Sequence, residues 1–186
     1  MPSVFWTGKL SPDMKLIVNF SNVLAWITGN ARDIAAMKQR MKLGYEGAFS
    51  DHVTRYDDVG LEHYTKIAIE LLKGVKVDDK DVIDIGCGTG ILSLLALKDG
   101  ATRVCCGDSS EYMLDQCRQK MTAEGYTGGR VDFRQIDAES LSVEDNRYDA
   151  AISSMVLGLV PNQQKMVNEM TRITQDVILA YGQKPG

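Results

Sequence analysis

The chain divides into two stretches that differ in their pattern of apolar and polar positions. From about residue 80 onward, short apolar or β-branched runs alternate with segments whose apolar residues recur every three or four positions. The short runs predict buried strands, and the longer segments predict helices that pack by one face. We expect strands over 81–85, 103–107, 131–136, 148–154 and 176–181, and helices over 90–98, 110–124 and 161–174. Strands that alternate with helices in this way predict an α/β fold with a parallel sheet.

The stretch before residue 80 lacks this alternation. Apolar positions at helical spacing predict a helix that starts at Pro12 and ends before Gly29, and a second over 31–43. Residues 45–60 are polar and predict a loop with one helical turn, and an amphipathic helix follows over 61–73. We therefore expect a helical extension or cap over residues 1–60 and an α/β domain over 61–186.

Composition and charge limit the kinds of partner. With 44% hydrophobic and 25% charged residues, the 186-residue chain has the composition of a globular protein. The net charge of −4 gives no chain-wide basic surface for nucleic acid, so we expect no nucleic-acid partner. Residues 1–44 nevertheless carry six basic and two acidic side chains. Such asymmetry is typical of an appendage with a partner of its own.

The cysteines and the termini indicate the compartment. The four cysteines show no CxxC spacing and predict reduced thiols in a core, without a metal site. No signal peptide is apparent, and the apolar stretch over 14–29 is too short and too polar for a membrane span. We expect a cytoplasmic protein.

The most informative segment joins the first strand of the α/β region to the helix after it. It reads Asp84-Ile85-Gly86-Cys87-Gly88-Thr89-Gly90, followed directly by an apolar helix. A phosphate-binding P-loop needs Gly-Lys-Ser/Thr after the turn, and a dinucleotide fingerprint needs glycine where Ile91 stands. The glycines leave room for a ligand close to backbone N–H groups. The carboxylate of Asp84 would repel a pyrophosphate and favours a ligand that carries an amino group.

This segment resembles the first motif of the class I S-adenosylmethionine-dependent methyltransferases, and two later segments are similar to their next motifs. Asp108 follows the second strand, where the family's acid accepts both ribose hydroxyls. Asp137 and Ala138 follow the third strand, at the place of the motif beside the adenine. The resemblance covers roughly residues 80–181, is greatest to the small-molecule branch that includes quinone-biosynthesis enzymes, and implies a Rossmann-like sheet in the order 3-2-1-4-5. It implies S-adenosyl-L-methionine as cofactor, with contacts from Asp84, Gly86, Cys87, Gly88, Gly90, Asp108, Ser109, Met113, Asp137, Ala138 and Ser153.

Methyl transfer is an in-line displacement that needs mainly positioning and desolvation, so few catalytic residues are expected. The segment over 153–159 lacks the Asn/Asp-Pro-Pro-aromatic pattern of resembling enzymes that methylate amino groups of DNA or glutamine. Its apolar residues suit a small organic methyl acceptor, although they could equally pack under a helix. The candidate catalytic residues are His52, as a base, and Tyr56, which the resemblance places over the methionine end of the cofactor.

Other functions stay open at this point. The chain could be a cofactor-binding fragment or a non-catalytic partner subunit. A lipid or quinone methyltransferase docked by its basic N-terminal helices on a membrane surface is less favoured, because such helices more often form a cap or a dimer contact. Family members close the sheet with two further strands for which residues 182–186 leave no room, so we expect a fragment, or an edge strand covered by the N-terminal helices or by a second copy in a homodimer. We expect cofactor binding with weak or no turnover.

Overall fold

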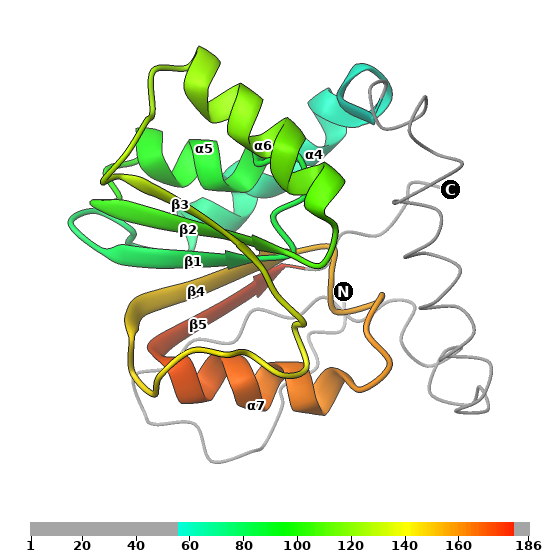
Figure 1. Cartoon of the computed structure of the whole chain (residues 1–186), viewed down its shortest axis with the longest axis vertical. Helices are drawn as coiled ribbons and strands as arrows, with labels where there is room; N and C mark the ends of the chain where they lie inside the picture. Colours follow the sequence, from blue (N-terminus) through cyan, green and yellow to red (C-terminus); the bar gives the residue numbers. More distant parts are fainter. Residues whose placement is uncertain (1–55, 181–186) are drawn as a thin grey trace.

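The computed structural model describes residues 56–180, which form a five-stranded parallel sheet with helices on both faces (Figure 1). In chain order the elements are α4 (Tyr56–Lys73), β1 (Asp81–Ile85), α5 (Ile91–Lys98), β2 (Arg103–Asp108), α6 (Glu111–Ala123), β3 (Val131–Gln135), β4 (Tyr148–Ser154), α7 (Gln163–Ile173) and β5 (Thr174–Ala180). The two helices expected within 12–43 lie outside the described residues.

The strand order is β3-β2-β1-β4-β5, and every pairing is parallel. This confirms the order implied by the methyltransferase resemblance. Because all five strands run the same way, their carboxyl ends meet at one edge of the sheet. The three motifs singled out in the sequence follow β1, β2 and β3 and therefore share this edge.

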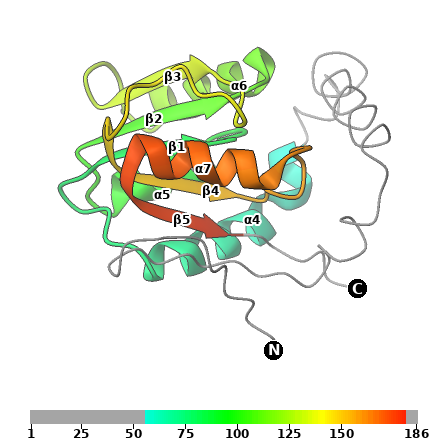
Figure 2. The same cartoon turned by 90° about the horizontal axis from the view of Figure 1, so that it is seen from below.

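The two faces of the sheet are covered unequally. Of the helices that the structure describes, α4, α5 and α6 lie on one face and α7 lies on the other, as Figure 2 shows from the side of α7. Alternate strand residues fill the two cores: Val82, Val104 and Cys106 pack toward the three helices, while Ile83 and Cys105 pack on the side of α7. Both faces of β1 are buried, so its apolar residues Val82, Ile83 and Ile85 do not alternate strictly with polar ones, and Asp84 is buried with them.

Local signals explain where the helices begin. The side chain of Ser110 accepts a hydrogen bond from the Met113 N–H at 3.3 Å and caps α6. Asn162 caps α7 in the same way, through the Lys165 N–H at 3.0 Å.

Most expected boundaries differ from the observed ones by one or two residues, but two differences have a physical cause. The loop expected up to residue 60 ends earlier, because α4 begins at Tyr56 and runs through Gly60. One glycine costs a helix only about 1 kcal/mol, so this glycine does not stop it. Strand β5 begins at Thr174, directly after α7 and without a turn, where the sequence analysis expected the helix to end. Helix α4 thus crosses the expected domain boundary after residue 60, and that division stays a prediction.

Candidate functional site

The glycine-rich loop after β1 is held by its own protein partners. The N–H groups of Gly86 and Cys87 donate to the Gly107 carbonyl at 2.7 and 2.9 Å, and the Gly90 N–H donates to the Cys87 carbonyl at 2.9 Å. These three N–H groups are therefore not available to a ligand, and the expectation of a ligand beside the N–H groups at the helix start stays a prediction for the others. Because these donors are already used, the loop is not an anion cradle of the P-loop kind.

All three loop glycines have positive φ angles, between +54° and +87°, but they differ in what surrounds them. A Cβ on Gly86 would lie 2.1 Å from Val156 Cγ2, and a Cβ on Gly90 would lie 2.4 Å from Cys117 Sγ. A Cβ on Gly88 would meet no protein atom within 4 Å. Gly86 and Gly90 are thus required for packing inside the protein, and Gly88 alone borders open space.

Asp108, the last residue of β2, joins the first two motifs. Its Oδ2 accepts from the Gly88 N–H at 2.9 Å, and its Oδ1 accepts from the Ser110 N–H at 2.9 Å. Burial raises the pKa of this carboxyl above its usual range, and the N–H groups of Ser110 and Gly88 oppose that rise. A carboxylate has about four acceptor positions, so Asp108 retains capacity for further donors such as a pair of hydroxyls.

Asp84 lies in the interior of the sheet, with no exposed surface. Its Oδ2 accepts from Ser93 Oγ at 2.6 Å, and its Oδ1 is buried without a hydrogen-bond partner. Burial raises the pKa of this carboxyl to about 8. The sequence predicts a charged carboxylate beside the ligand at this position, whereas the side chain is a buried acid whose raised pKa favours the protonated form.

The third motif follows β3 as a tight turn. Asp137 is exposed, its Oδ1 accepts from the Glu139 N–H at 3.0 Å, and it forms a β-bridge with Ser140. Ala138 is partly buried. The buried side chain of Glu139 accepts from the Asn162 N–H at 2.8 Å and so ties this turn to the start of α7.

A second tie to α7 was not foreseen from the sequence. The guanidinium of Arg172 donates to the carbonyls of Leu141 and Val143 at 2.9 and 2.7 Å and to the carboxylate of Glu169. Glu169 Oε2 also accepts from the Leu141 N–H at 2.7 Å. Arg172 therefore fixes the long connection between β3 and β4, and with it the third motif. An arginine near a helix end gives no such signal in the sequence, because its partners lie about thirty positions away.

The remaining predicted contact residues are placed as follows. Ser109 is exposed, while Cys87 and Met113 are buried. Ser153 is also buried, and its hydroxyl donates to the Ile85 carbonyl at 2.6 Å, which links β4 to β1. Of the two catalytic candidates, His52 lies outside the described residues, and Tyr56 is described only as the first residue of α4.

The loop after β4 borders the same edge with apolar side chains. Met155 has a φ of +66°, which is unusual for a residue other than glycine or asparagine, and turns the chain so that Val156 packs on Gly86. Met155 and Val156 are partly exposed, Leu157 is buried and Leu159 is exposed. The site thus combines a polar side after β1–β3 with an apolar side after β4.

Among residues 56–180, no three His, Cys, Asp or Glu side chains are grouped so as to hold a metal ion. None of the helices described is both long and apolar enough to span a bilayer.

Comparison with known proteins gives a matching family model, related sequences and similar solved structures. A family model described as a methyltransferase domain matches residues 82–176. The ribosomal protein L11 methyltransferase of Ruminiclostridium cellulolyticum is 31% identical over 101 residues, which is 54% of this chain and 32% of that protein. A phosphatidylethanolamine N-methyltransferase of Cereibacter sphaeroides is 30% identical over 93 residues, which is 50% of this chain and 44% of that protein.

A solved S-adenosylmethionine-dependent methyltransferase from Mesorhizobium loti has 26% identity and a TM-score of 0.50, over 56% of this chain and 46% of that one. The matches span only 32% and 44% of the length of these two curated relatives. The matched region contains all three motifs and the loop after β4. Since the family model covers half of the chain and the strand order agrees, the chain belongs to the class I S-adenosylmethionine-dependent methyltransferases.

Proposed function

We propose that the chain binds S-adenosyl-L-methionine at the carboxyl edge of the sheet and directs its methyl group to a small organic acceptor. The main support for the cofactor site is the hydrogen bond from the Gly88 N–H to Asp108 Oδ2. It brings the one glycine of the loop that borders open space beside an acid with spare acceptor positions. The family uses this cofactor as methyl donor, which supports the assignment.

The described residues fit the parts of the cofactor. The free acceptor positions of Asp108 suit the two ribose hydroxyls, and the open space at Gly88 admits the ligand without a steric clash. The turn at Asp137 and Ala138 lies at the same edge and suits the adenine. Asp84 has no exposed surface and so contributes no direct contact to the ligand. When bound, the cofactor supplies a methyl group on a sulfonium, which is open to in-line displacement.

The apolar loop after β4 supports a small organic acceptor. Met155, Val156 and Leu159 offer apolar surface beside the site and no side-chain charge. Methyl transfer gains from a dry, well-positioned acceptor, since desolvation favours attack on a sulfonium. The role of these residues is to exclude water and orient the acceptor.

The comparisons supply two other acceptor classes. One relative is named for ribosomal protein L11 and one for phosphatidylethanolamine, a membrane lipid. The basic character of residues 1–44 would suit an anionic membrane surface, which makes a lipid acceptor the second candidate. A third possibility is that the chain binds the cofactor but transfers no methyl group, and an experiment must distinguish this from methylation of a small molecule or a lipid.

The test has two stages. Calorimetry with S-adenosylhomocysteine establishes cofactor binding by the full chain, and the Asp108→Ala variant is the control. Transfer of a labelled methyl group is then measured to three acceptor pools: a small-molecule extract, ribosomal protein, and vesicles that contain phosphatidylethanolamine. The proposal expects binding, and label in the small-molecule pool above the Asp108→Ala background, even if turnover is weak. Label only in protein or in lipid would refute the acceptor class and leave the cofactor site intact.

A further inference from the structure

A second hollow lies at the opposite edge of the sheet from the methyltransferase motifs. It is a groove of about 340 Å³ at the amino ends of β1 to β4, on the same face of the sheet as α7. Helix α7 packs on β4 and β5, so this face of β2 and β3 has no helix over it among the described residues (Figures 1 and 2). The volume is within the usual range for small-molecule sites, which starts at about 300 Å³.

The lining of the groove is strongly basic, in contrast to the chain as a whole. Four arginines line it, Arg103, Arg130, Arg134 and Arg147, against the two acids Asp81 and Asp132. This is a formal excess of two positive charges within a chain of net charge −4. The arginines come from the starts of different strands and from within β3. They are separated in the sequence, and the sheet brings them to one groove.

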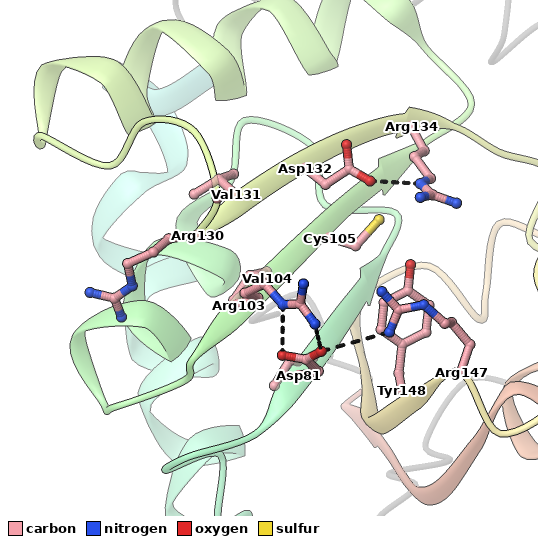
Figure 3. Close-up of a pocket in the computed structure, with 12 residues that line it drawn as sticks. Asp81, Arg103, Val104, Cys105, Arg130, Val131, Asp132, Arg134, Arg147 and Tyr148 are labelled. Atoms are coloured by element: carbon pink, nitrogen blue, oxygen red, sulfur yellow. Dashed lines mark hydrogen bonds and ion pairs between the residues drawn. The ribbon is translucent and has the colours of Figure 1, made fainter.

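Three of these arginines surround a common floor, formed by Cys105 and Tyr148 (Figure 3). Arg147 lies over the Tyr148 ring, with its guanidinium carbon 4.9 Å from the ring centre. Arg134 Nε donates to Asp132 Oδ2 at 2.7 Å, and Arg103 pairs with Asp81 through Nε at 3.0 Å. The acids thus fix the arginines in place.

The guanidinium groups are not saturated by these contacts. Each guanidinium has five N–H donors, and Arg134 spends one of them on Asp132. Arg147 lies 3.6 Å from Asp81 Oδ2, which is too long for a good hydrogen bond, and its side chain is 41% exposed. These arginines are partly exposed, are held in place by stacking and ion pairs, and keep free N–H donors. Such donors are suited to an anion with several oxygens.

We propose that this groove binds a small phosphate-bearing molecule. A phosphate offers three or more oxygens at tetrahedral angles, which matches donors that converge from β2, β3 and the start of β4, whereas a carboxylate offers two oxygens in one plane. Residues 1–44 do not suit the groove as occupant, because their own excess of basic side chains would be repelled. The ligand is recognised by Arg134 and Arg147, with Arg103 as the third donor and Tyr148 as the floor.

The groove is separate from the proposed cofactor site. Along β1, Asp81 borders the groove and Ile85 lies at the carboxyl edge, four residues or roughly 13 Å away. On β3 the groove reaches further, because Arg134 is in register with Gly107, one residue before Asp108, but its guanidinium donates back to Asp132. A ligand in the groove therefore does not occupy the space at Gly88 and Asp108. The phosphate site depends only on the residues that line the groove. Failure of the proposed methyl transfer would therefore not affect it.

The test is a titration of the isotope-labelled full chain followed by amide chemical shifts in NMR. Pyrophosphate and adenosine diphosphate are the probes for free and nucleoside-linked phosphate, and succinate is the carboxylate control of similar charge. The matched variants are Arg147→Gln and Arg134→Gln in the groove, and Arg118→Gln on α6, which removes one exposed arginine charge from the opposite face.

We expect saturable shifts at Asp132, Arg134 and Tyr148 with at least one phosphate probe, and little shift at Gly88. Each groove variant should weaken that binding by about tenfold, while Arg118→Gln stays within about twofold of the wild type. The proposal is overturned if neither phosphate probe gives saturable shifts at those amides. It is equally overturned if succinate binds as tightly as the better phosphate probe, or if Arg118→Gln weakens binding as much as Arg147→Gln.

Discussion

The side chain of Val156 lies directly over Gly86, so close that a Cβ on the glycine would be 2.1 Å from Val156 Cγ2. Two segments 70 positions apart, the loop after β1 and the loop after β4, are locked together by this contact. One loop borders the proposed cofactor site and the other borders the proposed acceptor site. Because of this contact, Gly86 is required for packing, whereas Gly88 borders open space. Substitutions at the two positions can therefore separate stability from ligand binding.

Gly86→Ala should destabilise the fold by about 2–4 kcal/mol, because the new methyl group overlaps Val156 and the positive φ is costly for alanine. Gly88→Ala should cost only about 1 kcal/mol, since its Cβ enters open space, but it should abolish binding of S-adenosylhomocysteine. Urea unfolding and calorimetry on both variants measure the two effects.

The control is the double variant Gly86→Ala with Val156→Ala, in which the overlapping side chain is shortened. It should recover part of the stability that Gly86→Ala loses. A double variant whose loss equals the sum of the two single losses would show that the contact does not determine the requirement for Gly86.

The buried carboxyl of Asp84 should make stability fall as pH rises. Its pKa of about 8 in the folded chain is above the ordinary value of 3.8, so the folded state holds the proton more tightly than the unfolded state. This contribution is fully present below about pH 4 and is lost as pH rises through about 8. Asp84→Asn has no proton to lose, so its stability relative to the wild type should increase by up to about 1.4 kcal/mol per pH unit in this window. Urea unfolding at pH 5, 6.5 and 8 provides the comparison, and parallel curves for the two proteins would disprove the protonated state.

Arg172 should control the order of the connection between β3 and β4. Arg172→Leu removes the donors to the Leu141 and Val143 carbonyls and leaves the partly buried carboxylate of Glu169 with the Leu141 N–H but without the guanidinium. We expect a loss of about 1–3 kcal/mol in the free energy of unfolding and faster amide hydrogen exchange over residues 137–145. Arg118→Leu on the opposite face is the control for removal of a surface arginine. Unchanged exchange over 137–145 would mean that the network does not hold the third motif.

The sequence predicted much of the framework because its signals are local. Short apolar or β-branched runs predicted the bounds of every strand to within two residues, and the helix expected over 110–124 is α6. The glycine-rich loop, Asp108 and Asp137 come at or after the ends of three successive strands, and this order predicted that they share one edge of the sheet.

What the sequence did not predict depends on contacts between distant residues. Gly86 and Gly90 are required because the side chains of Val156 and Cys117 lie against them, and these residues are distant in the sequence. Alternation could not show that Asp84 is buried, because both faces of β1 are covered. The basic groove is formed by arginines that only the sheet brings together, and no local pattern marks it.

The central claim, a cofactor site built on Gly88 and Asp108, is tested most directly by calorimetry of S-adenosylhomocysteine with the wild type, Asp108→Asn and Asp108→Ala. We predict saturable binding by the wild type and a loss of about 2–4 kcal/mol in Asp108→Ala, or roughly 30-fold to 1,000-fold in affinity, because a charged acceptor of the ribose hydroxyls is removed. Asp108→Asn should lose less, since its amide oxygen still accepts. Urea unfolding of each variant shows whether the fold is retained. No binding by the wild type, or equal affinities in the wild type and a folded Asp108→Ala protein, would contradict the account.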